Sequence, residues 1–206
     1  MNILYSFFIG YILGSFPTAY ILLKRYKNVD IRCEGSGNVG AHNSFKVSKS
    51  KLIGFSVLSI DLLKGFCTVL IVKLIIGDDF LYIMTGLNAA VFAHCYSPWI
   101  NFKGGRGIAT AGGGSLLISI PILIIWGIVW LIAFIFPRNI HISNISASVF
   151  TAVASFVSAL SLNRLTSPRA SSTLEFGLFV GTLMMIILVK HFDPMKVLLL
   201  KWYNKN

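Results

Sequence analysis

Charged residues are scarce in this chain, and acidic residues are much fewer than basic ones. Of its 206 residues only 12% are Asp, Glu, Lys or Arg, whereas 55% are apolar. A soluble domain of this size has too little interior to bury so many apolar side chains. The composition also excludes a disordered tail, which would be polar and highly charged. The class that remains is an integral membrane protein.

The shortage of acidic residues leaves a large positive charge. Seven Asp and Glu stand against 18 Lys and Arg, which gives a formal net charge of +11. On a soluble protein this excess would be typical of nucleic-acid binding, but beside long apolar runs it is typical of loops next to anionic lipid. We therefore expect membrane lipid, and no nucleic acid, as a partner.

Cysteine is nearly absent as well. Cys33, Cys67 and Cys95 are odd in number and irregularly spaced. Neither a disulfide framework nor a zinc site is predicted from such a pattern. We expect free thiols and no bound metal.

Long uncharged runs separated by short polar segments predict an all-α, polytopic helical membrane protein. Residues 1–23 carry no charge, and cations follow this run rather than precede it, which is the reverse of a signal peptide. The run is interpreted as an uncleaved span with its N-terminus outside. Residues 24–51 then form a cytoplasmic loop, because they hold seven Lys and Arg against Asp30 and Glu34.

Further uncharged runs predict the remaining spans, at about 52–76, 80–96, 142–162 and 174–189. The uncharged stretch 107–137 would be about 45 Å long as one helix, well beyond a ~30 Å hydrocarbon core. This stretch is therefore too long to cross the membrane once without tilting or breaking.

Two features suggest that the stretch 107–137 crosses twice. It contains Gly112–Gly114 and Pro121, which weaken or break helices, so two short helices joined near 119–121 are predicted. Two crossings also put the four tail lysines in the cytoplasm and only two arginines outside. These residues are Lys190, Lys196, Lys201 and Lys205, and Arg164 and Arg169. We expect seven spans, with six as the alternative, a cytoplasmic C-terminus, and a single membrane-embedded domain over 1–206.

The first cytoplasmic loop has the composition of a phosphate-binding loop. Gly35, Gly37 and Gly40 allow successive backbone N–H groups to turn toward one point. Neutral donors and cations surround these glycines: Ser36, Asn38, Asn43, Arg32 and Lys46. The spacing matches Gly-x-Gly-x-x-Gly, but without a strand–turn–helix context a dinucleotide fold is only weakly indicated. A flexible polar loop is the alternative, and composition alone does not choose between them.

A second Gly-rich segment opens the run 107–137. It reads Phe102-Lys103-Gly104-Gly105-Arg106-Gly107 and is followed by Thr110. Backbone N–H groups, cations, a hydroxyl and a helix N-terminus meet here, which predicts an anion site at the membrane surface. The spacing is not that of a Walker A loop. The alternative is an interfacial turn with snorkelling cations, but three glycines around the cations favour the anion site.

Four further side chains are candidates for chemistry. Asp61 and Lys64 share one helix face inside the second span, and a structural ion pair is slightly favoured over direct catalysis. His94, beside the second Gly-rich segment, and His191, at the start of the tail, can bind phosphate, move a proton, or form an interfacial hydrogen bond. The chain has no His-x4-Asp, Gly-x-Ser-x-Gly or His-Glu-x-x-His pattern.

Taken together, these segments resemble one family, the PlsY-type glycerol-3-phosphate acyltransferases of bacterial membranes. Residues 35–43 are similar to its first motif, 61–65 to its second-helix signature, and 94–110 to its second motif. The resemblance implies an enzyme that moves a fatty acyl group from acyl phosphate to the 1-hydroxyl of glycerol 3-phosphate, giving lysophosphatidic acid and phosphate. It also implies a monomer without metal or other cofactor, with its site at the cytoplasmic face of the bacterial inner membrane.

The resemblance assigns roles residue by residue. It implies that Ser36, Asn38 and His191 are catalytic. It implies that substrate is bound by Arg32, Gly37, Gly40, Asn43, Lys46, Lys64, His94, Lys103, Gly104, Gly105, Arg106, Gly107 and Thr110.

The chain departs from the family at several positions. His42 stands where the family usually has Thr, Lys46 where it has Arg, and Arg106 where it has Lys. In the third motif, Pro194 replaces an Asn that is expected to contact substrate, so reduced turnover is one expectation. The alternative from another class is a small-anion transporter or channel, which would place its polar residues near the middle of the membrane.

Overall fold

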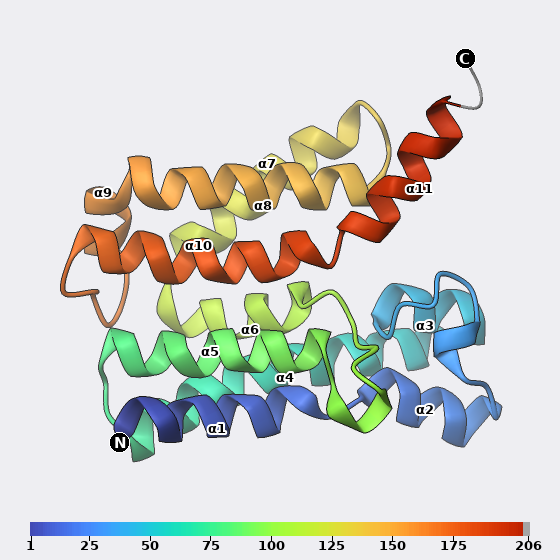
Figure 1. Ribbon diagram of the computed structural model, residues 1–206, viewed down its shortest axis with the longest axis horizontal. Coiled ribbons are helices and arrows are strands. Elements are labelled where there is room, and N and C mark those ends of the chain that lie inside the picture. Colours follow the sequence, from blue (N-terminus) through green and yellow to red (C-terminus); the bar gives the residue numbers. More distant parts are fainter. Residues whose placement is uncertain (204–206) are drawn as a thin grey trace. The chain divides into compact units, whose positions relative to one another are not determined.

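The computed structural model describes residues 1–203, and over that range the regular structure is helical, as predicted (Figure 1). The chain divides into two compact units, Met1–Ile118 and Ser119–Asn206. Each unit is described by itself, and the single domain over 1–206 stays a prediction.

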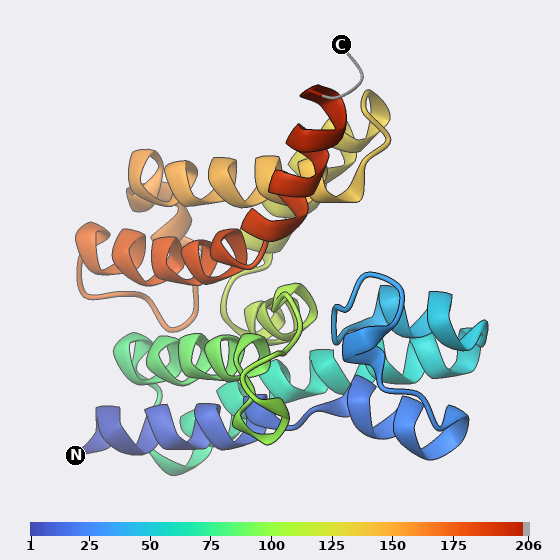
Figure 2. The same cartoon turned by 45° about the vertical axis from the view of Figure 1, so that its right-hand side comes forward.

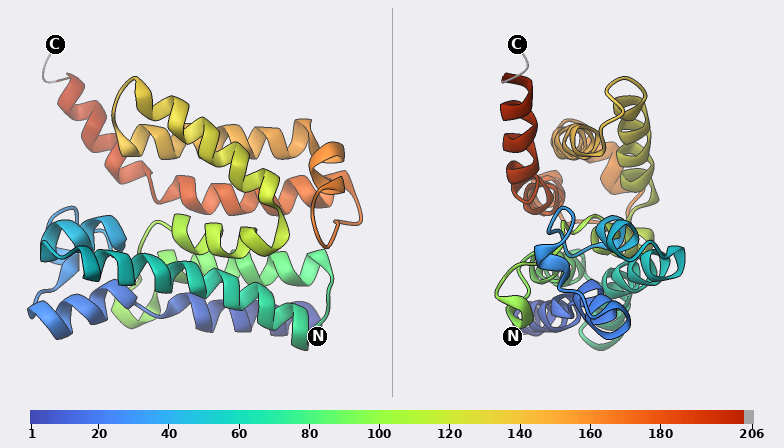
Figure 3. Two further views of the ribbon diagram at one scale, coloured as in Figure 1. Left: turned by 180° about the vertical axis from the view of Figure 1, so that it is seen from behind. Right: turned by 90° about the vertical axis from the view of Figure 1, so that its right-hand side faces the viewer.

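The first unit contains six α-helices and two short 3₁₀ turns. Its elements are α1 (Asn2–Ser15), α2 (Thr18–Lys27), η1 (Ile31–Cys33), α3 (Ala41–Ser48), α4 (Lys51–Ile75), α5 (Phe80–Cys95), η2 (Pro98–Ile100) and α6 (Ile108–Ile118). Helix α5 lies along α1, and α4 lies along α6 (Figures 1 and 3).

Glycines allow these helix pairs to pack backbone against backbone. A Cβ atom at Gly10 of α1 would overlap the carbonyl of Gly86 in α5. A Cβ atom at Gly65 of α4 would likewise overlap the carbonyl of Thr110 in α6. Close approach through small residues is how helices in membranes gain packing contacts, because lipid offers no hydrophobic driving force between them.

The glycine run in α6 corrects one expectation. Gly112–Gly114 were expected to weaken or break a helix, yet α6 continues through them. The reason is again packing, since Cβ atoms at Gly113 and Gly114 would overlap Leu62 of α4 and Leu87 of α5. The predicted junction near 119–121 is confirmed, because α6 ends at Ile118 and α7 begins at Ile120.

The first apolar run contains a break that the charge pattern did not predict. Helix α1 ends at Ser15 and α2 begins at Thr18, so residues 1–23 are not one continuous helix. Pro17 accounts for the break, since it has no N–H and disfavours helical geometry at Phe16 before it. Phe16 has an extended ψ of 118°. Backbone carbonyls next to the break become available to other partners.

The second unit is a set of helices with a polar internal face. It contains α7 (Ile120–Ile135), α8 (Ile140–Val157), α9 (Ala159–Arg164), α10 (Thr173–Val189) and α11 (Phe192–Tyr203). Helix α8 packs against both α7 and α10 (Figure 1). The indole N–H of Trp126 donates to the hydroxyl of Ser148 at 3.2 Å, so polar residues of α8 find partners inside the unit.

Several helices match the dimensions of a bilayer. Within the described residues, the helices Lys51–Ile75 and Ile140–Val157, and the stretch Asn2–Lys27 formed by α1 and α2 together, are long and apolar enough to cross one. Shorter apolar helices are Ile108–Ile118, Ile120–Ile135 and Thr173–Val189. The count of seven spans and the orientation of the termini stay predictions.

Candidate active site

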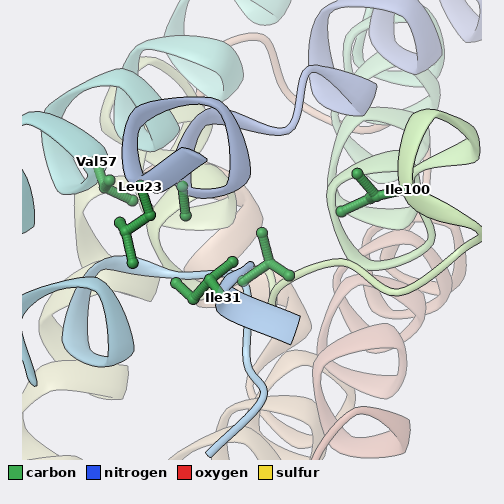
Figure 4. Close-up of a cluster of buried hydrophobic side chains, with 6 residues drawn as sticks. Leu23, Ile31, Val57 and Ile100 are labelled. Atoms are coloured by element: carbon green, nitrogen blue, oxygen red, sulfur yellow. The ribbon is translucent and has the colours of Figure 1, made fainter. Parts of the chain in front are cut away.

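Both Gly-rich segments belong to the first unit, and one hydrophobic cluster lies beneath them. Its members are at most 3% exposed and are Ala19, Leu23, Ile31, Val39, Val57 and Ile100. Figure 4 shows side chains from α2, η1, α4 and η2 meeting in this cluster. Figure 2 shows the second segment at the end of α5 that lies away from the N-terminus, and the first segment farther out beside α3. Segments about 60 residues apart in sequence are therefore joined through buried apolar contacts.

Asn43 organises the first loop from within. Its side chain is 1% exposed, and its Oδ1 accepts the backbone N–H of Ser36 at 3.0 Å. Its Nδ2 donates to the carbonyls of Glu34 at 3.0 Å and Asn38 at 3.1 Å. A side chain whose amide is used in this way fixes the shape of the loop, and the substrate contact expected for Asn43 stays a prediction.

The loop also needs glycine at particular points. Gly35 and Gly37 have φ values of 60° and 68°, in the left-handed region that glycine adopts without steric cost. A Cβ atom at Gly35 would also overlap Oδ1 of Asn43. Ser36 between them is exposed and Asn38 is half-buried, so both can face a ligand.

Arg32 connects the first loop to the second. Its Nη2 donates to Asp30 Oδ2 at 2.6 Å and its Nε to Asp30 Oδ1 at 2.9 Å. Its Nη1 donates to the carbonyl of Ile100 at 3.4 Å. The guanidinium lowers the pKa of Asp30 to about 2, mainly by donating to the carboxylate. Because its charge is already paired, Arg32 is placed to hold the loops together, and its contact with substrate stays a prediction.

The second loop is fastened to the end of α5. The N–H of Gly104 donates to the carbonyl of Cys95 at 3.1 Å, and the N–H of Gly105 donates to the carbonyl of His94 at 3.0 Å. A Cβ atom at Gly105 would lie 2.8 Å from the carbonyl oxygen of Val39 and would overlap the His94 ring. Gly105 is thus the point where the two loops touch, and no larger residue fits there.

The polar groups around this contact are mostly cationic. Lys103 and Lys46 are exposed, and Arg106 is half-buried just before α6, where burial lowers its pKa. The pKa of His42 is also lowered, first by burial and then by Lys46 and Arg106. Groups from both loops therefore lie within one positive field at the N-termini of α3 and α6, an arrangement that favours a bound anion.

Thr110 and Gly107 lie deeper than this cationic surface. Gly107 is buried with a φ of 82°, which places the turn into α6 in the left-handed region. Thr110 is 0% exposed, and its hydroxyl has no hydrogen-bond partner within the part of the chain that the structure describes. Its burial against α4 separates it from the exposed cations, and its predicted binding role stays a prediction.

A buried ion pair lies beneath the loops, as the sequence pattern had slightly favoured. Lys64 Nζ lies 2.6 Å from Asp61 Oδ1 and donates to the carbonyl of Phe16 at 2.6 Å. His94 Nδ1 is 3.8 Å from the same carboxylate oxygen. These side chains line a cavity of about 10 Å³, far too small for a phosphate ester. Lys64 and His94 therefore support the loops from below, while the substrate contacts predicted for them remain untested.

The ion pair and a neighbouring serine also satisfy backbone carbonyls at the break between α1 and α2. Here Lys64 places its own ammonium on the Phe16 carbonyl, and the hydroxyl of Ser97 donates to the carbonyl of Ser15 at 2.5 Å. The break between α1 and α2 is thus closed by side chains of the protein itself.

His191 belongs to the second unit and is fully buried there. Its Nδ1 is 2.8 Å from the carbonyl of Ile187, which only accepts, so Nδ1 donates. Asn144 Oδ1 accepts the indole N–H of Trp130 at 2.7 Å, so the Asn144 amide N–H faces His191 Nε2 at 3.1 Å. These partners specify a neutral imidazole with its proton on Nδ1. The catalytic role of His191 stays a prediction.

Sequence reasoning missed Trp130 and Asn144. The available signal was an amide side chain within the apolar run 142–162, since an uncharged polar group there needs a partner. Pro194 lies in the first turn of α11, where a missing N–H leaves no helix hydrogen bond unmade. The replacement of the family's Asn by Pro therefore fits the local helix.

The comparison with known families decides which of these interpretations holds. The family model described as glycerol-3-phosphate acyltransferase matches residues 4–201. The chain belongs to the glycerol-3-phosphate acyltransferase family. The glycerol-3-phosphate acyltransferase of Anaplasma marginale (strain Florida) is 31% identical over 186 residues, covering 90% of this chain and 86% of that protein. Glycerol-3-phosphate acyltransferase 2 of Moorella thermoacetica is 39% identical over 150 residues, covering 72% and 74%.

Solved structures of PlsY, an integral membrane glycerol 3-phosphate acyltransferase, show the same fold. The glycerol 3-phosphate form matches with a TM-score of 0.76 at 30% identity, covering 98% of this chain and 94% of that one. The lysophosphatidic acid form matches with a TM-score of 0.73, also at 30% identity, covering 98% and 93%. The family resemblance inferred from the motifs is therefore confirmed.

Proposed function

We propose that this chain transfers a fatty acyl group from acyl phosphate to the 1-hydroxyl of glycerol 3-phosphate, giving lysophosphatidic acid and phosphate. Membership of the family supports acylation of glycerol 3-phosphate. The acyl phosphate donor, the bacterial inner membrane and a site facing the cytoplasm rest on the resemblance of the motifs. The observation that carries the proposal is the meeting of two Gly-rich loops in one positive field.

Two phosphate groups have to be held, one on each substrate. The cations Lys103 and Arg106, with the backbone N–H groups of residues 104–107, are proposed to bind one of them at the N-terminus of α6. Ser36, Asn38 and Lys46 are proposed to hold the other substrate and to position its hydroxyl. Asn43 keeps Ser36 in place through its backbone N–H, so it supports this group from within the loop.

The proposed reaction is a direct acyl transfer. The hydroxyl oxygen attacks the acyl carbonyl carbon, the bond from that carbon to the phosphate oxygen breaks, and the hydroxyl proton passes to a phosphate oxygen. Acyl phosphate is a mixed anhydride with a good leaving group, so positioning and neutralisation of charge supply most of the rate. An acyl-enzyme is not required, and the proposal uses no metal and no cofactor.

The test is a donor comparison with purified protein in detergent. One reaction receives acyl phosphate and glycerol 3-phosphate, and a parallel reaction receives acyl-CoA in place of acyl phosphate. Lysophosphatidic acid and free phosphate formed only from acyl phosphate support the proposal. Product from acyl-CoA overturns the donor assignment, and no product from either donor in folded protein overturns the activity. Light scattering on the same sample tests the expected monomer.

A further inference from the structure

His42 is the position where this chain carries a titratable group in place of the family's Thr. It lies in the first turn of α3, with Gly40 at the N-cap, and its side chain is exposed. Lys46 follows it by four residues, so both side chains lie on the same face of the helix. An exposed imidazole at a helix N-terminus, beside a lysine, can reach a ligand bound at the loops.

The second loop brings another cation to the same place. Gly105 contacts the carbonyl of Val39, three residues before His42, and Val39 and Gly105 line the same small cavity. Arg106 comes directly after Gly105. His42 therefore has Lys46 on its own helix and Arg106 on the facing loop, and both cations act on its ring.

The other charges on elements that pack against α3 are also mostly positive. They are Lys24, Arg25 and Lys27 on α2, Arg32 and Glu34 at η1, and Lys51, Asp61, Lys64 and Lys73 on α4, where Asp61 and Lys64 pair with each other. Arg32 is paired with Asp30, and Glu34 is exposed. Partial burial of the ring, Lys46 and Arg106 lower the pKa of His42 in the protein alone, which favours the neutral ring.

We propose that His42 is a third basic group of the phosphate site and takes up a proton when glycerol 3-phosphate binds. The inference rests on the proposed function, because it requires a phosphate ester at the two loops. A bound phosphate dianion offsets the positive field of Lys46 and Arg106 and brings negative charge to the ring, which favours the imidazolium. Thr at this position donates a neutral hydrogen bond and takes up no proton, so the coupling is specific to chains with His here.

The sign of the pH dependence follows from proton uptake. If binding adds a proton to His42, affinity for glycerol 3-phosphate rises as the pH falls from 8 toward the pKa of the free ring. The rise stops near pH 6, where the phosphate ester itself begins to be protonated. Each unit by which the pKa of the bound enzyme exceeds that of the free enzyme tightens binding by at most about tenfold, and the full gain is reached only below the pKa of the free ring.

The test is calorimetric titration of the full-length protein with glycerol 3-phosphate, without acyl donor, at pH 7. Running it in two buffers with different ionisation enthalpies counts the protons taken up. We expect a substantial fraction of a proton for the wild type and, for H42T, only the small amount due to the substrate. H42T is also expected to bind more weakly at pH 6.5, with a flatter pH profile. Size-exclusion profiles check that each variant is folded.

A matched histidine control separates this site from general effects. His141 lies in α8 of the second unit, and H141N should keep the proton uptake of the wild type. Equal proton uptake by H42T and the wild type overturns the inference, and so does loss of uptake in H141N alone. Failure of the acyl transfer assay leaves the calorimetric result intact, so the two proposals fail separately. If the wild type binds no glycerol 3-phosphate at all, both are overturned.

Discussion

Replacing Asp61 with Asn removes the counter-charge of a lysine that lies inside the helix bundle of the first unit. Lys64 is only 7% exposed, and its ammonium lies 2.6 Å from the Asp61 carboxylate. After the substitution the ammonium keeps its hydrogen bond to the carbonyl of Phe16. Leaving a buried charge without its partner costs about 3–5 kcal/mol. The unfolding equilibrium should therefore shift by roughly two to four powers of ten.

The assay is unfolding in mixed micelles with increasing dodecyl sulfate, followed by tryptophan fluorescence. Asp78→Asn is the control, because Asp78 in the turn after α4 lies 3.2 Å from Lys73 near the end of that helix, with both side chains well exposed. An exposed pair contributes about 0–1 kcal/mol. If Asp61→Asn costs no more than Asp78→Asn, the buried pair does not support the fold as argued.

A double variant separates stability from function. Changing Asp61 to Leu together with Lys64 to Met removes both charges, and such a replacement is often neutral or stabilising. We expect the double variant to recover most of the stability lost in Asp61→Asn. Acyl transfer should nevertheless stay low, because Lys64 no longer holds the Phe16 carbonyl at the break beneath the loops. Wild-type turnover in the double variant would remove the ion pair from any role in positioning.

Three further predictions follow from single contacts. Gly105→Ala should abolish acyl transfer while the protein still inserts in membranes, because the new Cβ atom would lie 2.8 Å from the carbonyl oxygen of Val39 in the first loop. Gly127→Ala is the control and should keep wild-type turnover, because a Cβ atom there would face open space. The pKa of Asp30 is lowered to about 2, so its ion pair with Arg32 contributes about 0–1 kcal/mol to the free energy of unfolding from pH 8 to 5. This contribution should be lost as the pH falls from about 4 toward 2. Asp30→Asn should remove this acid dependence in thermal unfolding. Asn144→Leu removes a hydrogen-bond partner of the Trp130 N–H and of the His191 ring. The free energy of unfolding should fall by about 1–3 kcal/mol in the same micelle assay. An unchanged unfolding midpoint would contradict the hydrogen-bond assignment.

Much of this protein could be predicted from short stretches of sequence. The small number of charged residues indicates a membrane protein. The uncharged runs predict the ends of most helices to within a few residues, because helix formation depends on neighbouring side chains. The chemistry of the loops is also local, since glycines, amides and cations within ten residues indicate an anion site whatever packs around them. The junction before α7 belongs to this group, because Pro121 is tolerated in the first turn of a helix.

Contacts between distant segments depended on the tertiary structure. Gly112–Gly114 remain helical because α4 and α5 approach them closely, which no local pattern indicates. Lys64 bonds the carbonyl of Phe16, and His42 shares a positive field with Arg106, because folding brings together residues far apart in the chain. Helix periodicity tells which side chains share a face but not which element that face meets. The sequence by itself thus determined the membrane class, the helices and the loop chemistry, whereas the partners of each polar group were decided by packing.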